Sequence, residues 1–151
     1  MPSSVDPHPV ACTFCVSDVA DERVRAAIAT PLLAYNESQF GPAGHRPLVV
    51  AMRDSQNRVV GGLWGATSYG WLYTQLLFVP ESQRGQGVGQ RLLQLAESEA
   101  ALRGCHSAWV DTFEARLFYE HLGYSCFGEL PEHPHGFTRS FMRKALVPRS
   151  I

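Results

Sequence analysis

A run of alternating glycines beside an arginine is the feature of this chain with the clearest chemistry. It follows an apolar segment that ends in Leu77, Phe78 and Val79, and it consists of Arg84, Gly85, Gln86, Gly87, Val88, Gly89 and Gln90. Without side chains at three positions, several backbone N–H groups can approach an oxyanion closely, and the helix expected next adds the positive end of its dipole. The loop is therefore predicted to bind phosphate oxygens, and a pyrophosphate would fit there.

Other kinds of glycine-rich loop fit this stretch less well. A nucleoside triphosphate loop needs Gly-Lys followed by Ser or Thr, and Gly89, Gln90 and Arg91 supply neither. A dinucleotide-binding fold would use Asp111, about twenty residues downstream, as its ribose-binding acid, but its glycines follow G-x-G-x-x-G instead of G-x-G-x-G. A plain turn that only links a strand to a helix stays open as the simplest alternative.

The elements around the loop are the most clearly patterned in the chain. Residues 88–102 carry an apolar face at helical spacing, and Gly104 follows where a helix cap belongs. Residues 71–79 before the loop and residues 107–112 after the helix are predicted strands. A strand, a helix and a strand of these lengths form a crossover with parallel strands, so the loop lies at the carboxyl end of a strand, where open α/β sheets bind ligands.

The whole chain is predicted to be α/β, with a mixed central sheet flanked by helices in a single domain over residues 10–147. Its 151 residues, 45% of them hydrophobic, suffice for one core and not for two. The remaining expected elements are a flexible lead-in at 1–9, a strand at 11–16, a helix after Asp18 that Pro31 bends or ends, a polar connection at 35–47, a hairpin with strands at 48–53 and 58–64, a helix at 114–122, and closing strands at 124–130 and 138–144.

The spacing Val79-x-x-x-x-Arg84-x-x-Gly87-x-Gly89 resembles the acyl-CoA-binding motif of the GNAT superfamily of N-acetyltransferases. The run from Phe118 to Tyr124 is similar to the family's second signature, an aromatic residue followed by Tyr-Glu-x-x-Gly-aromatic on a helix. The resemblance covers roughly residues 48–146. It implies acetyl-CoA as the cosubstrate, with its pyrophosphate on the loop and its pantetheine arm on a strand that separates from its neighbour near Leu77, Phe78 and Val79.

One position departs from the family's pattern. Where the family often has an asparagine, seven residues before the signature tyrosine, this chain has Thr112. The threonine hydroxyl can still hydrogen-bond the cofactor arm, but with less reach and with one donor instead of two.

Acetyl transfer to an amine needs a neutral nitrogen, a donor for the oxyanion and a proton for the departing thiolate. The resemblance implies Tyr119 as the general acid and a backbone N–H near Leu77 as the oxyanion donor. For the general base, Asp111, Glu37 and Glu129 are the carboxylates to test, and a water chain to solvent is the alternative. On periodicity alone, Tyr119 is as well explained as a helix residue that packs in the core.

The histidines and cysteines indicate no metal site. His133 and His135 flank a proline in a predicted surface loop and lack a clear third ligand, so we expect that loop to shape an acceptor pocket, together with Tyr35, Asn36, Glu37, Trp64, Trp71 and Tyr73. Cys12, Cys15, Cys105 and Cys126 are expected to be ordinary core or surface thiols.

Charge and hydropathy limit the partners. The net charge is −1, so nucleic acid is not an expected partner, and no window approaches the ~20 apolar residues of a membrane span. We expect a cytoplasmic protein, with no membrane partner, that pairs through its sheet edges as a homodimer.

The function that the sequence predicts is N-acetyl transfer from acetyl-CoA to a primary amine by direct attack within a ternary complex. A non-catalytic acyl-CoA-binding module or regulator is the alternative, because no dedicated base is evident. Formation of an acetylated product distinguishes the two.

Overall fold

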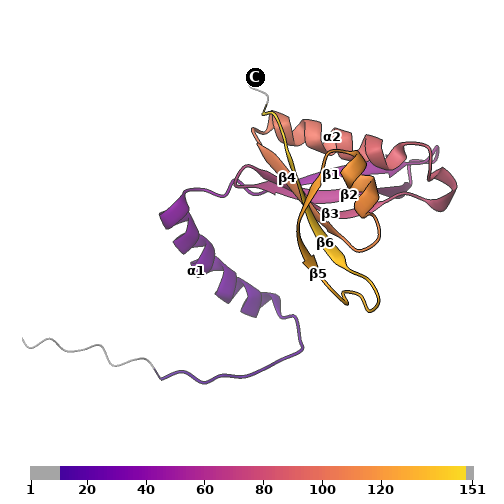
Figure 1. Cartoon of the computed structure of the whole chain (residues 1–151). Coiled ribbons are helices and arrows are strands. Elements are labelled where there is room, and N and C mark those ends of the chain that lie inside the picture. The colour runs from indigo at the N-terminus through magenta and orange to yellow at the C-terminus, as the bar shows by residue number, and fades with distance from the viewer. Residues whose placement is uncertain (1–10, 149–151) are drawn as a thin grey trace, which may run out of the picture. The chain divides into compact units, whose positions relative to one another are not determined.

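The computed structural model describes residues 11–148, and it divides the chain into two compact units, one up to Gly41 and one from Pro42 onward. The first unit contains the helix α1 (Glu22–Phe40) and is described by itself. The second unit holds a six-stranded sheet with its remaining helices (Figure 1). The predicted lead-in, residues 1–9, lies outside the described residues.

The sheet is mixed, as predicted, and runs in the order β1-β2-β3-β4-β6-β5. Only the β3–β4 pair is parallel among the described strands, and it is joined through α2 as the crossover pattern predicts. The elements of the second unit are β1 (Arg46–Arg53), β2 (Val59–Ser68), β3 (Trp71–Phe78), a short 3-10 helix η1 (Glu81–Gln83), α2 (Val88–Leu102), β4 (Ser107–Thr112), α3 (Arg116–His121), β5 (Ser125–Leu130) and β6 (Arg139–Ala145).

The core lies between one face of the sheet and α2. Leu72 of β3, Leu93 of α2 and Met142 of β6 are almost completely buried there. Leu63 of β2 and Val110 of β4 belong to the same cluster. Buried and exposed side chains alternate along β2 and β4, so the apolar side chains of these strands face α2. This packing sets the position of the first turn of α2 relative to the end of β3.

Two predicted elements near the N-terminus are wrong. Residues 11–16 form no strand, because the described residues of the first unit include no other strand that could complete a ladder of backbone hydrogen bonds. The polar connection expected at 35–47 is helical as far as Phe40, because α1 continues through Pro31 and ends only at Gly41, which has a φ of 79°. Glu37 therefore lies on a helix, and its carbonyl accepts the Gly41 N–H at 2.9 Å.

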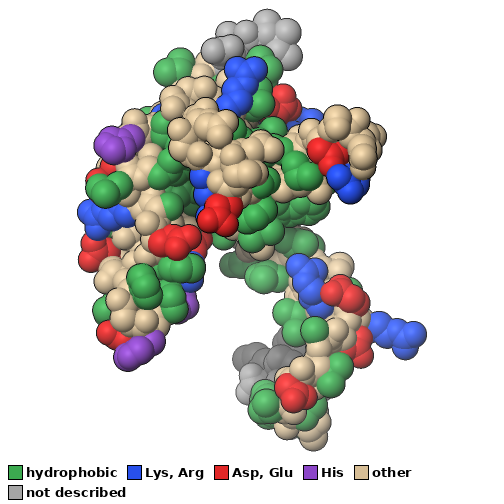
Figure 2. All heavy atoms as spheres, turned by 90° about the vertical axis from the view of Figure 1, so that its right-hand side faces the viewer, with side chains coloured by type: hydrophobic (Ala, Val, Ile, Leu, Met, Phe, Trp, Pro, Cys, Tyr) green, Lys and Arg blue, Asp and Glu red, His purple; other side chains and the backbone are tan. Residues whose placement is uncertain are grey.

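No helix within residues 11–148 combines the length and the apolar character needed to cross a membrane. On the face drawn in Figure 2, basic and acidic side chains are interspersed, and hydrophobic side chains gather in the middle of the sheet-bearing unit.

Candidate active site

The glycine loop joins β3 to α2 and leaves the start of α2 open. Gly85 and Gly87 have φ values of 74° and 78°, which an L side chain rarely adopts, and Gly87 is the N-cap of α2. No side chain caps this helix and no acidic residue lies in its first turn, so its first N–H groups and its positive dipole end are available to an anion. A Cβ at Gly85 or Gly87 would meet no heavy atom within 4 Å, so both face open space in which a phosphate fits.

Gly89, unlike Gly85 and Gly87, is needed for helix packing. A Cβ at this position would lie 3.2 Å from Cζ of Phe118 and 3.7 Å from a methyl group of Val79. The glycine thus lets the aromatic ring of α3 approach the first turn of α2. Of the three alternate glycines, two are required by the backbone conformation of the loop and the third by close packing.

Arg84 is held at the edge of the glycine loop. Its Nε donates to the carbonyl oxygen of Val79 at 2.9 Å, and its guanidinium lies over the ring of Phe78 at 5.8 Å from the centroid. No carboxylate pairs with Arg84 among residues 11–148. Its terminal nitrogens therefore remain available for a charge-assisted bond to a phosphate.

The strands β3 and β4 separate just before the loop. Their parallel pairing runs from Trp71–Ser107 to Thr74–Val110 and goes no further. An irregularity at Gln75 coincides with this point, since Thr74 pairs with Gly65 of β2 and Leu76 pairs with Trp64. Beyond Thr74, the side of β3 that faced β4 no longer pairs with it, as the predicted separation near Leu77, Phe78 and Val79 requires.

Two hollows meet at this separation. One, of about 470 Å³, is lined by the loop glycines, Arg84 and both Leu77 and Val79, and the other, of about 360 Å³, is lined by Thr74, Asp111 and Tyr119. They share Leu77, Ala115 and Phe118 as lining residues. The glycine loop and the tyrosine of the second signature therefore border neighbouring hollows that have lining residues in common.

Tyr119 is only 4% exposed, and its ring packs edge-on against Phe118 and Tyr124. Burial, and after it the negative charge of Asp111, raises the pKa of Tyr119 to about 12. The phenol is thus protonated throughout the neutral range, so it can give up a proton there but cannot take one up. Within residues 11–148 its oxygen makes no hydrogen bond.

Asp111 is already engaged. Its Oδ2 accepts from Nη1 of Arg139 at 2.7 Å, and its Oδ1 accepts from the Tyr73 hydroxyl at 3.3 Å. Arg139 also donates from Nε to Nδ1 of His133 at 3.1 Å and lies over the ring of Phe113. A carboxylate held in this network can orient an acceptor beside the cavity, because each of its oxygens keeps a further lone pair for a hydrogen bond.

Arg139 was not predicted as a site residue, although it lines the same cavity as Tyr119. Its place depends on the pairing of β4 with β6, which brings residues nearly thirty positions apart together. The alternation of side chains along β6 shows on which face of the sheet Arg139 lies only after the pairing register of β6 is known. The local sequence therefore carries no signal for it.

The other candidate residues are distributed as follows. Glu129 pairs with Arg116 at 2.7 Å on the surface. Glu37 belongs to the N-terminal unit and has no defined position relative to the cavity. The Oγ1 of Thr112 accepts from the Ala115 N–H at 3.0 Å, so its hydroxyl proton remains as a donor toward the cavity it lines.

The loop between β5 and β6 carries His133 and His135, which point to separate partners. His133 accepts from Arg139, whereas His135 lies 2.6 Å from Glu132. No group of three His, Cys, Asp or Glu side chains converges on a possible metal position in the described part of the chain. Cys105 is buried and Cys126 is half-buried.

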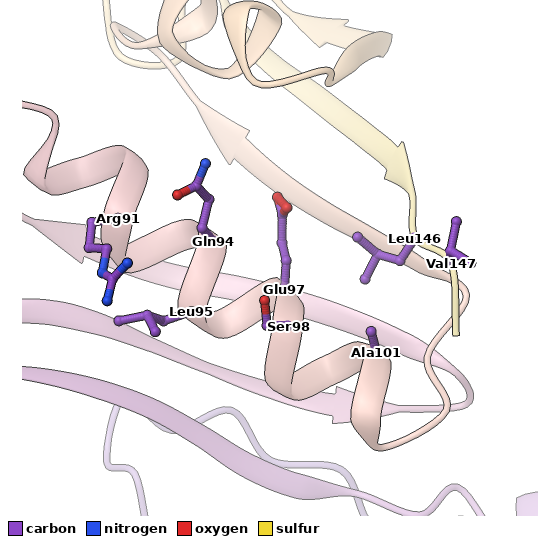
Figure 3. A pocket seen from close by; sticks show the side chains of 8 residues that line it. All are labelled: Arg91, Gln94, Leu95, Glu97, Ser98, Ala101, Leu146 and Val147. Carbon is purple, nitrogen blue, oxygen red and sulfur yellow. The ribbon is translucent and has the colours of Figure 1, made fainter. Parts of the chain in front are cut away.

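A larger hollow, of about 600 Å³, runs along the outer side of α2 and does not contain the predicted chemistry. Figure 3 shows its side chains on successive turns of α2, opposite Leu146 and Val147. Neither the loop glycines nor Tyr119 line it. Glu97, at its edge, is held by Nζ of Lys144 at 2.8 Å and by the Tyr124 hydroxyl at 3.1 Å, which together satisfy this buried carboxylate.

Comparison with protein families agrees with the geometry. The family model of the acetyltransferase (GNAT) domain matches residues 44–126, which include β3, the glycine loop, α2 and Tyr119. The chain is 45% identical over 133 residues to an acetyltransferase from Agrobacterium fabrum, covering 87% of this chain and 97% of the relative. It is 32% identical over 137 residues to blasticidin-S acetyltransferase from Streptomyces morookaense, covering 87% and 93%. The chain belongs to the GNAT acetyltransferase family.

Solved structures share the fold. A crystal structure of an Agrobacterium tumefaciens protein assigned as an acetyltransferase matches with a TM-score of 0.86 at 44% identity, covering 89% of this chain and 100% of that one. An aminoglycoside 6'-N-acetyltransferase complexed with coenzyme A matches with a TM-score of 0.58 at 25% identity, covering 70% and 76%. A relative in fold and sequence thus binds coenzyme A.

Proposed function

We propose that this protein transfers the acetyl group of acetyl-CoA to a primary amine by direct attack in a ternary complex. The observation that carries the proposal is the pair of neighbouring hollows, with Leu77, Ala115 and Phe118 as common lining residues, that lie between the glycine loop and Tyr119 where β3 and β4 separate. One hollow is lined by the glycine loop, which would bind an anion, and the other is lined by a buried phenol. This is the arrangement that a phosphate-bearing thioester requires.

In this proposal, the loop and Arg84 hold the pyrophosphate of the cosubstrate. The N–H groups of Gly87 through Gln90 and the start of α2 would face its oxygens. The unpaired side of β3 at Leu77 and Phe78, and Val79 directly after the strand, would bond the pantetheine arm, with Thr112 as a further donor. A backbone N–H near Leu77 would stabilise the oxyanion.

The reaction forms a C–N bond and breaks a C–S bond, while the nitrogen loses a proton and the sulfur gains one. Tyr119 supplies the proton for the sulfur. Because Arg139 and Tyr73 hold Asp111 in place, we assign Asp111 to orienting the acceptor, and we assign proton removal to water that reaches the cavity from solvent. No enzyme nucleophile is needed, since the thioester is itself reactive, and positioning supplies much of the rate.

Amine-dependent release of free thiol from acetyl-CoA tests the proposal. The acceptors tested should include a polyamine, an aminoglycoside, an amino acid and a peptide with a free N-terminus. Blasticidin S should be tested as well, because one relative is a blasticidin-S acetyltransferase. Reactions without amine measure hydrolysis. If no amine of this panel accelerates thiol release in a protein that binds acetyl-CoA, the result would favour the non-catalytic binding module instead.

The homodimer and the cytoplasmic location expected from the sequence remain predictions.

A further inference from the structure

Thr112, the last residue of β4, holds the turn that leads into α3. Its Oγ1 accepts from the Ala115 N–H at 3.0 Å. Ala115 is the N-cap of α3, and alanine has no side-chain oxygen that could bond the first N–H groups of a helix. Because α3 has only six residues, it is too short to be stable by its own hydrogen bonds, and its start depends on support from outside the helix.

Two consecutive hydrogen bonds connect Thr112 to Tyr119. The Ala115 N–H donates to Thr112, and the Ala115 carbonyl oxygen accepts from the Tyr119 N–H at 3.2 Å. The other end of this connection is fixed in the sheet, since Thr112 pairs with Ser140 of β6, which is buried. The Thr112 hydroxyl is therefore a link between a fixed strand end and the backbone of the proposed proton donor.

We propose that Thr112 is a positioning residue for Tyr119. Its hydroxyl oxygen fixes the first turn of α3 through Ala115 and thereby sets where the phenol lies in the cavity. The inference rests on the proposed function, in which Tyr119 gives its proton to the leaving sulfur. Since a proton donor must lie within hydrogen-bond reach of its target, a loose first turn would lower turnover without removing any reacting group.

The ring contacts of Tyr119 do not replace this link. Its ring packs edge-on against Phe118, which belongs to α3 itself, and against Tyr124, which follows α3. Neither contact ties the helix to the end of β4. The positioning role uses the oxygen of Thr112 as an acceptor, so the hydroxyl proton is still free to bond the pantetheine arm, and each of the two bonds would strengthen the other.

Two substitutions separate the hydroxyl from the shape of the side chain. Thr112→Val keeps the branched shape and should lower turnover at saturating acetyl-CoA about tenfold, whereas Thr112→Ser keeps the hydroxyl and should stay within about twofold. In a Tyr119→Phe background, Thr112→Val should cause no further loss, because the threonine acts through the phenol. Thr67→Val is the matched control. It also removes a bonded hydroxyl, which accepts from Nη1 of Arg103 at 3.1 Å, but Thr67 lines neither hollow, so turnover should be unchanged.

Hydrogen exchange of single backbone amides, followed by NMR without acetyl-CoA, provides a readout that does not depend on turnover. In Thr112→Val, the amides of Ala115 and Tyr119 should exchange at least about tenfold faster relative to the core amide of Leu93, and in Thr112→Ser and Thr67→Val they should not. Unchanged relative exchange at both positions in Thr112→Val overturns the proposal, even if no acceptor amine is found.

Turnover supplies the remaining outcomes. An active parent whose Thr112→Val variant turns over normally, or a Tyr119→Phe background in which Thr112→Val still lowers turnover, overturns the positioning role and leaves the proposed function intact. Faster exchange at Ala115 and Tyr119 in a protein that no amine activates would count against the proposed function and would still support the link from Thr112 to Tyr119.

Discussion

Replacing Tyr119 with phenylalanine removes the proposed proton donor and keeps the ring. The ring is buried against Phe118 and Tyr124, and the hydroxyl has no hydrogen-bond partner in the described chain, so its removal strands no other polar group. The free energy of unfolding should therefore change by no more than about 1 kcal/mol. Affinity for acetyl-CoA should also change little.

The loss of turnover can be estimated from the pKa of Tyr119. Burial raises that pKa to about 12, whereas an alkyl thiol titrates at about 8.5, so complete proton transfer to a free thiolate is uphill by roughly 5 kcal/mol. The phenol then contributes mainly a hydrogen bond to the charge that develops on sulfur, about 1.5–3 kcal/mol. Turnover of Tyr119→Phe should fall about ten- to a hundredfold, the low end of what a positioned proton donor provides.

Tyr124→Phe is the matched control, because it is the same chemical change in the neighbouring buried ring. The Tyr124 hydroxyl donates to Glu97 at 3.1 Å, so this variant should lose about 1.5–3 kcal/mol of unfolding free energy and keep near-parental turnover. The assay is thiol release with a responsive amine, alongside urea unfolding. If Tyr119→Phe turns over like the parent, or Tyr124→Phe loses as much activity, the general-acid role of Tyr119 is refuted.

Three further predictions concern the loop and the buried tyrosines. Arg84→Ala should weaken acetyl-CoA far more than a pantetheine thioester without the phosphates, with exposed Arg91→Ala as the control, and equal losses for both ligands would make Arg84 structural. Asparagine tolerates the φ of 78° at position 87, so Gly87→Asn should keep the melting temperature. Calorimetry should show acetyl-CoA binding weakened more than tenfold, or about 1.4 kcal/mol, and an unchanged affinity would show that the loop is not part of the site. Because the pKa of Tyr119 is raised in the folded state, the tyrosine contributes up to about 3 kcal/mol to the free energy of unfolding below pH ~10, and this contribution is lost toward pH 12. Urea unfolding should therefore show that the free energy of unfolding falls less steeply between pH 10 and pH 12 in Tyr119→Phe than in the parent. An equally steep fall in both proteins would contradict the assignment.

The elements around the glycine loop were predictable because local pattern decides them. The amphipathic run and the glycine that follows it mark α2, whose observed bounds are Val88–Leu102, as predicted. The parallel pairing of β3 with β4 follows from the length and handedness of the crossover. The loop glycines have two roles: some adopt a left-handed backbone, and one packs closely on Phe118. The sequence alone does not show which glycine has which role.

Most of the parts that were missed depend on long-range pairing, but one is local. The helix α1 continues through Pro31 because the flanking residues favour the helix, although an internal proline removes a helical hydrogen bond and crowds the preceding turn. The ion pair of Asp111 with Arg139 requires the register of β4 and β6.

The most direct test of the account follows the acetyl group itself. Acetyl-CoA with a deuterated acetyl group is incubated with the protein and a responsive amine, and both the amine and the intact protein are analysed by mass spectrometry. The account predicts one deuterated acetyl group on the amine nitrogen for each thiol released, with no acetylated protein intermediate. Thiol release with unlabelled amine, or a protein that carries the label before the amine does, would contradict direct transfer.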